Sequence, residues 1–178
     1  MHYCVHLFTK SLPTEKEIAE IMSPYNDENF EENPVFTWDH YLIGGRYGGA
    51  IKLKVCIEDD EYKWKFYAHE PREGRLFYSA ILNDIRTHFP FYERDEEDYL
   101  PYMGFHDGFI YVDGARIKDI INFDDLSCYI CIDAEKNVIA RSSWDGEHWV
   151  EDSDFDEKYK AIKERSKDYF ITVLDIHD

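Results

Sequence analysis

The residues best suited to chemistry lie in segment 36–49, where two glycine pairs flank an arginine and a tyrosine. Glycine lets the backbone adopt a positive φ or approach a ligand closely, because it has no Cβ. The planar guanidinium of Arg46 suits a phosphate or a carboxylate, and nearby aromatic rings can supply faces on which a base stacks. The segment therefore predicts a binding site for a small phosphorylated ligand, formed by Trp38, Tyr41, Gly44, Gly45, Arg46 and Tyr47.

A purely structural role for the same segment stays open. Its spacing matches neither GxxxxGKS/T nor GxGxxG, the two common phosphate-binding glycine motifs. In the structural interpretation the glycines allow a β-bulge or a strand crossing in which the aromatic rings pack. Arg46 would then pair with one of the 38 carboxylates of the chain. The two interpretations differ in whether Arg46 is free to bind a ligand.

A second set of reactive side chains lies near the two ends of the chain. Asp175 and His177 are two residues apart on an expected strand, so both point to one face of a sheet. The same spacing relates His2, Cys4 and His6 on the first expected strand. If these strands pair, the cluster could bind a metal or perform acid–base chemistry, and the alternative is a structural histidine–aspartate hydrogen bond. Asp175 and His177 are thus candidate catalytic residues, and no metal or other cofactor is predicted.

Other sequence signals of catalysis or metal binding are absent. Cys128 and Cys131 have CxxC spacing, but no second CxxC or histidine pair accompanies them as a zinc site requires. The sequence has no GxSxG or HExxH motif. The four cysteines are too few for a disulfide-stapled secreted domain, and no apolar stretch approaches the roughly 18 residues of a membrane span. We therefore expect reduced thiols, a cytoplasmic location and no membrane contact.

The net charge of −18 over 178 residues limits the partners of this protein. Proteins that grip nucleic acid or anionic lipid usually present a basic face, so direct nucleic-acid binding is not expected. A basic or neutral partner is more plausible. Three acidic clusters could meet a basic partner, with interleaved aromatic residues as anchors, and the alternative is that they only solvate the surface. The clusters are Asp27–Glu32, Glu93–Asp98 and Glu151–Glu157, and the aromatic residues are Phe30, Tyr92, Tyr99 and Phe155.

Short strands and helices must position these residues. Apolar and β-branched residues predict strands over 2–8, 51–57, 62–66, 109–112, 128–132, 138–140 and 169–177. Helices are expected from the Thr14–Glu17 capping box to before Pro24, over 76–89 and over 154–167. Segments 51–66 and 128–140 have the pattern of hairpins. The sequence predicts a single α+β domain over 1–178, with a mostly antiparallel or mixed sheet built from hairpins and about three helices.

The motif F-x-W-D-x-x-x-I-G-G-R-Y-x-G links the chain to known sequences. With this motif, the chain resembles an uncharacterised family encoded by tailed bacteriophages and prophages. The matching pieces are Pro24-Tyr25, Trp38-Asp39, Gly44–Tyr47, Met103-Gly104 and Asp175–His177. The resemblance implies a phage accessory gene and carries no assigned activity.

Three hypotheses about function result. The first is a phage counter-defence or host-modulating protein that acts by binding and sequesters a phosphorylated small ligand, such as a signalling nucleotide. The second is an acidic nucleic-acid mimic that inhibits a basic host defence protein. The third is a phosphoester hydrolase that uses Asp175, His177 and Arg46. Binding is favoured over catalysis, the expected location is the host cytoplasm, and the chain is compatible with a homo-oligomer.

Overall fold

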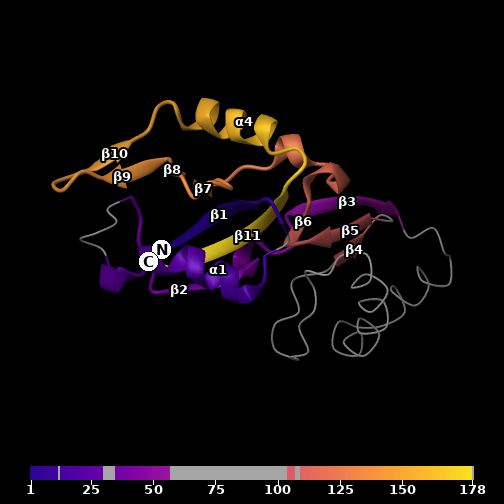
Figure 1. Cartoon of the computed structure of the whole chain (residues 1–178), viewed down its shortest axis with the longest axis horizontal. Helices are drawn as coiled ribbons and strands as arrows, with labels where there is room; N and C mark the ends of the chain where they lie inside the picture. Colours follow the sequence, from indigo (N-terminus) through magenta and orange to yellow (C-terminus); the bar gives the residue numbers. More distant parts are fainter. Residues whose placement is uncertain (12, 30–34, 57–103, 107–108, 178) are drawn as a thin grey trace.

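The computed structural model describes residues 1–11, 13–29, 35–56, 104–106 and 109–177 (Figure 1). A mixed sheet of six strands forms its centre. In spatial order the strands are β2 (His40–Ile43), β11 (Phe170–His177), β1 (His2–Thr9), β7 (Ile130–Ile132) and β8 (Val138–Ala140), and β6 (Gly114–Arg116) also pairs with β11. β1 runs parallel to β7, and the other pairs are antiparallel. This order places the two ends of the chain side by side.

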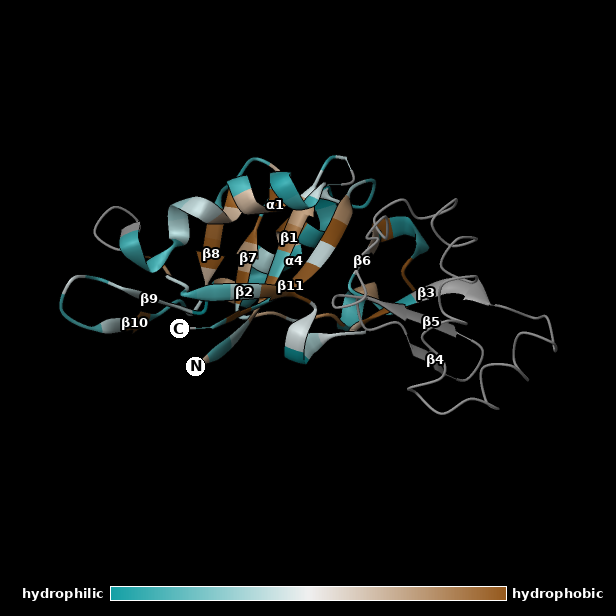
Figure 2. Ribbon diagram, turned by 90° about the horizontal axis from the view of Figure 1, so that it is seen from below, coloured by the Kyte–Doolittle hydropathy of each residue, from teal (hydrophilic) through white to brown (hydrophobic). Residues whose placement is uncertain are grey.

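Two helices cover opposite faces of this sheet, α1 (Glu15–Met22) and α4 (Phe155–Arg165) (Figure 1). Alternate residues of β1 and β11 face the two helices, and both strands are almost entirely buried. On the α1 side, Ile18 and Met22 pack in one cluster with residues of β1 and β11. On the α4 side, Phe155 and Tyr159 pack in a second cluster. Figure 2 shows the resulting hydrophobic colouring along β1, β7, β8 and β11.

Smaller elements extend the fold beyond the central sheet. β3 (Ile51–Cys56), β5 (Phe109–Val112) and β4 (Gly104–His106) form a three-stranded sheet, and β9 (Ser142–Trp144) pairs with β10 (Trp149–Glu151). Short 3-10 helices lie at Ser23–Tyr25, Asp27–Asn29, Gly45–Tyr47, Ile117–Asp119 and Phe123–Asp125. Within the described ranges, no helix has the length and apolar character needed to cross a membrane.

The elements predicted from short sequence signals agree with the structure within the described residues. Thr14 caps α1 as a capping box, because its side chain accepts a hydrogen bond from the Glu17 amide at 3.2 Å and its own amide donates to Glu17 Oε2 at 2.7 Å. The helix over 154–167 and the hairpin over 128–140 are confirmed.

The α+β class and the mixed sheet are confirmed, but hairpins do not build the sheet centre. β1 pairs with β11 from the other end of the chain and with β7 in parallel, because strands with two apolar faces occupy the middle of a covered sheet. Two α-helices lie in the described residues, and the expected helix over 76–89 lies outside them. The strand expected over 62–66 also lies outside the described residues, and β3 pairs with β5.

Candidate functional site

The glycine-rich segment forms a tight turn that follows β2 and lies against β11. Gly44 and Gly45 have φ values of 73° and 52°, and residues 45–47 form a single 3-10 turn. Two buried carboxyl groups bind the backbone of this turn. Asp175 Oδ2 accepts a hydrogen bond from the Arg46 amide at 2.9 Å, and Asp113 Oδ1 accepts one from the Gly49 amide at 2.6 Å. Both aspartates are almost completely shielded from solvent.

These carboxyl groups explain why glycine occupies positions 44 and 45. A Cβ on Gly44 would lie 2.5 Å from the carboxyl carbon of Asp113, and a Cβ on Gly45 would lie 2.4 Å from Cβ of Asp175. The aspartates therefore approach the backbone where a side chain would otherwise stand. The Arg46 and Gly49 amides, which could have bound a phosphate, already donate to internal oxygens. Internal carboxyl groups therefore hold the backbone of the turn, and the Arg46 side chain is exposed.

The structure does not bring all six predicted ligand-binding residues together. Trp38 donates its indole N–H to the carbonyl oxygen of Met22 at 2.9 Å, and its ring lies 5.1 Å from that of Tyr41. Both rings pack in the cluster on the α1 side of the sheet, whereas Tyr47 packs in the cluster on the α4 side. The structure therefore does not place Trp38 and Tyr41 beside Tyr47 as a common stacking surface.

Tyr47 and Arg46 lie next to the start of β1. The Tyr47 hydroxyl donates to the backbone oxygen of His2 at 3.2 Å. Burial raises the pKa of this hydroxyl, the nearby Asp175 raises it further, and Arg46 acts in the opposite direction. The Arg46 guanidinium thus lies within electrostatic range of the Tyr47 hydroxyl, and its side chain is exposed.

Three histidines meet on adjacent strands at the end of the central sheet. The register places His2 opposite His177 and His177 opposite His40. The His177 ring lies 4.8 Å from the His2 ring, which it meets edge-on, and 4.9 Å from the His40 ring, which it stacks on. The sheet therefore lines up three imidazoles on the face that α4 covers further along.

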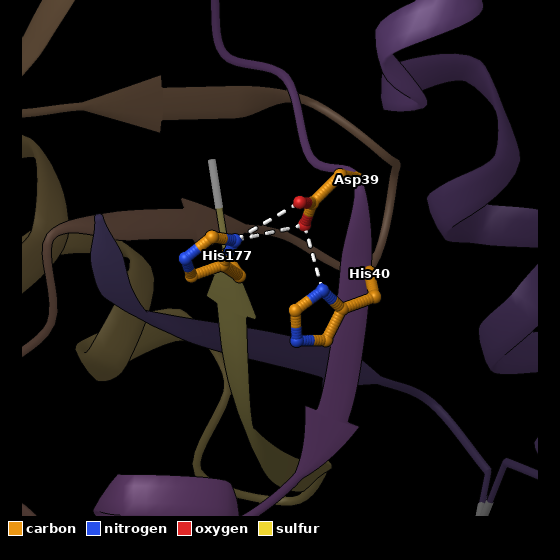
Figure 3. A group of neighbouring side chains, drawn as sticks. All are labelled: Asp39, His40 and His177. Atoms are coloured by element: carbon orange, nitrogen blue, oxygen red, sulfur yellow. Dashed lines mark hydrogen bonds and ion pairs between the residues drawn. The ribbon is translucent and has the colours of Figure 1, made fainter.

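The Nδ1 atoms of these three imidazoles lie within hydrogen-bond distance of two aspartate carboxyl groups. His177 Nδ1 lies 3.1 and 3.0 Å from the two oxygens of Asp39, and His40 Nδ1 lies 2.7 Å from Asp39 Oδ1 (Figure 3). The hydrogen bond from His177 is the main reason why the pKa of Asp39 is lowered. His2 Nδ1 lies 2.9 Å from Asp175 Oδ1. Each imidazole thus has an aspartate carboxyl group as the hydrogen-bond partner of its Nδ1.

The two candidate catalytic residues have different partners. Asp175 binds His2 and the Arg46 amide, while His177 binds Asp39. The sequence left the pairing of the terminal strands as a condition, and the structure meets it, because β1 pairs with β11 and brings His2, Asp175 and His177 to one face. Sequence reasoning missed Asp39 and His40. The only signal in the sequence was an aspartate–histidine pair directly before an apolar segment. The pairing of β2 with β11 is what brings this pair next to His177.

Cys4 and His6, which share a face of β1 with His2, are buried further along the strand. His6 Nδ1 lies 2.6 Å from the Tyr159 hydroxyl, and burial lowers the His6 pKa to about 3. Burial raises the pKa of the Cys4 thiol to about 12. Both residues lie in the protein interior and do not join the histidine cluster.

Two aspartates in the described part of the acidic clusters make ion pairs within the chain. Asp152 pairs with Lys158 at 2.7 Å, and Asp156 pairs with Arg141 at 2.6 Å. Phe155, one of the aromatic residues predicted to anchor a partner, is 1% exposed in the core. Cluster 93–98 and residues 30–32 lie outside the described residues.

Comparison of the chain with protein-family models, with curated proteins and with solved structures finds no match. The function is therefore inferred from the geometry of the side chains.

Proposed function

We propose that the protein binds a small phosphorylated ligand through Arg46, at the face where the glycine-rich turn meets the ends of β1 and β11. One observation carries this proposal. Arg116, Arg141 and Arg165 each make an ion pair with an aspartate, whereas the Arg46 guanidinium has no hydrogen bond or ion pair within the described ranges. In a chain of net charge −18, an exposed arginine without a partner among the described residues is available for an external anion.

The surroundings of Arg46 suit a phosphate group. A chain of contacts leads from the Arg46 amide to Asp175, from Asp175 to His2, and from the His2 ring to His177. A guanidinium binds phosphate through two parallel N–H donors, and imidazoles close by can donate further hydrogen bonds. The rigid turn fixes the backbone of Arg46, so less conformational freedom is lost when a ligand binds.

The biological setting of this binding follows from the resemblance alone. In a phage or prophage, a protein that sequesters a phosphorylated signalling nucleotide would act as a counter-defence or host-modulating factor. This setting stays a prediction. The support from the side chains concerns only the anionic group of the ligand.

Removing the Arg46 side chain is expected to weaken ligand binding without unfolding the protein. AMP and inorganic pyrophosphate are the probes, measured by isothermal titration calorimetry. Arg46→Ala should lower the affinity for at least one probe about tenfold, equivalent to about 1.4 kcal/mol. Its free energy of unfolding should change by less than about 1 kcal/mol, since the side chain is exposed and unpaired.

Two further variants sharpen this test. Arg46→Lys should fail to restore full affinity, because lysine keeps the charge but loses the planar donor fork. Arg116→Ala is the control, since Arg116 is partly exposed and pairs with Asp119. Equal affinities of the parent and Arg46→Ala, or no binding of either probe at millimolar concentration, would contradict the proposal.

A further inference from the structure

We propose that Asp39, His40 and His177 form a binding site for a divalent transition-metal ion of the Zn²⁺ type. This inference goes beyond the proposed function, because it concerns a cation and ligands other than Arg46, and it can be tested without a phosphorylated ligand. One carboxylate and two imidazoles are a donor set that Zn²⁺ accepts, and three protein ligands leave one tetrahedral position open.

The three donor groups already converge. Both imidazoles turn Nδ1 towards the same carboxyl group, as the dashed lines in Figure 3 show. One donor atom from each residue can be chosen so that all three lie within 4.8 Å of one another. Bonds of about 2.0–2.2 Å to a tetrahedral Zn²⁺ hold donor atoms roughly 3.3 Å apart. Small rotations of exposed side chains would therefore close the site.

The backbone fixes where these side chains start. His40 and His177 are direct cross-strand partners in β2 and β11, and the Asp39 amide donates to the His177 carbonyl oxygen at 2.9 Å. The sheet thus sets the spacing of all three Cα atoms before any ion binds. His2 packs edge-on against His177 and limits the motion of that ring. Such preorganisation lowers the entropy lost on binding.

Charge also favours a cation at this place. The net charge of the chain is −18, and the site includes the Asp39 carboxylate with Asp175 close behind His2. All three proposed ligands are accessible, since Asp39 and His40 are exposed and His177 is partly exposed. The competing explanation is that Asp39 only accepts hydrogen bonds from two imidazoles, and the experiment separates the two.

The test is a titration of the chelator-treated full chain with Zn²⁺ in competition with a chromophoric chelator. We expect the parent protein to bind Zn²⁺ and its melting temperature to rise when the ion is added, because a ligand of the native state stabilises that state. His177→Gln and Asp39→Asn should each weaken Zn²⁺ binding at least about tenfold. His148→Gln is the matched control, because His148 is an exposed histidine in the β9–β10 turn, and it should bind as the parent does.

A second readout identifies the ligand types. Bound Co²⁺ should give the visible absorption of a four- or five-coordinate site without a thiolate-to-cobalt charge-transfer band, because the three proposed ligands include no cysteine. If His177→Gln fails to fold, His40→Gln and Asp39→Asn decide, since both positions are exposed. Unchanged Zn²⁺ affinity in these variants, or no Zn²⁺ uptake by the parent at micromolar concentration, would overturn the proposal.

Discussion

Gly44→Ala is expected to destabilise the protein by about 3 kcal/mol or more, which urea unfolding would measure as a lower midpoint. Gly44 has a φ of 73°, and a residue with a Cβ costs roughly 1–2 kcal/mol in that region. The new Cβ would also lie 2.5 Å from Asp113 Cγ and Oδ2. Moving that carboxyl group breaks its hydrogen bond with the Gly49 amide, and a buried unsatisfied partner costs about 1–3 kcal/mol more.

Gly146→Ala provides the matched control for this prediction. Gly146 also has a positive φ, of 106°, but its Cβ would meet no atom within 4 Å. Its loss of stability should therefore reflect backbone strain alone. If Gly44→Ala costs no more than Gly146→Ala, the close approach of Asp113 to the turn is not what requires glycine at position 44.

Gly44→Ala and Arg46→Ala together separate the scaffold of the turn from the proposed ligand site. The glycines and the two buried aspartates explain the backbone of the turn, and no ligand needs to be invoked for them. The Arg46 side chain takes no part in that scaffold. A variant in the turn should therefore lose folding and binding together, whereas Arg46→Ala should lose binding alone.

The sequence predicts those elements whose signals are local. The capping box of α1 and the polar turn between β7 and β8 lie within a few residues of the structure they specify. The pairing of β1 with β11 and β7 is not local. Alternation along a strand tells which residues share a face, but it does not tell which strand lies alongside.

Because strand pairing cannot be read from the sequence, only some of the site residues could be predicted. His2, Asp175 and His177 could be placed on shared faces from spacing alone, and the pairing of the termini brings them together. Asp39 and His40 could not be assigned to the cluster, because their place depends on the register of β2 against β11. Trp38 and Tyr41 were grouped with Tyr47 because they are close in sequence.

Those aromatic residues show why proximity in sequence misleads in a strand. Tyr41 and His40 are consecutive in β2, so they point to opposite faces of the sheet. Tyr41 accordingly packs on the α1 side, whereas His40 joins the histidine cluster on the other side. The turn after β2 then returns Tyr47 to the α4 side. A short segment thus supplies residues to both faces.

Lowering the pH from 7 to 5 is expected to cost the folded state about 2 kcal/mol through His6 alone. His6 is 1% exposed, and burial, with a smaller contribution from Lys163, lowers its pKa to about 3. In the unfolded chain the histidine pKa is about 6.5. Between these values the unfolded state binds a proton that the folded state does not, so stability falls as the pH falls. The slope is about 1.4 kcal/mol per pH unit below about pH 6.5.

Urea unfolding of the parent and of His6→Gln at pH 7 and pH 5 isolates this contribution. Glutamine does not titrate, so the stability of the variant should fall by about 2 kcal/mol less than that of the parent over this interval. Acidification also neutralises part of the −18 net charge, but this effect acts on both proteins equally. Parallel pH profiles for the parent and His6→Gln would mean that His6 takes up a proton as readily in the folded state as in the unfolded state, against its burial beside Tyr159.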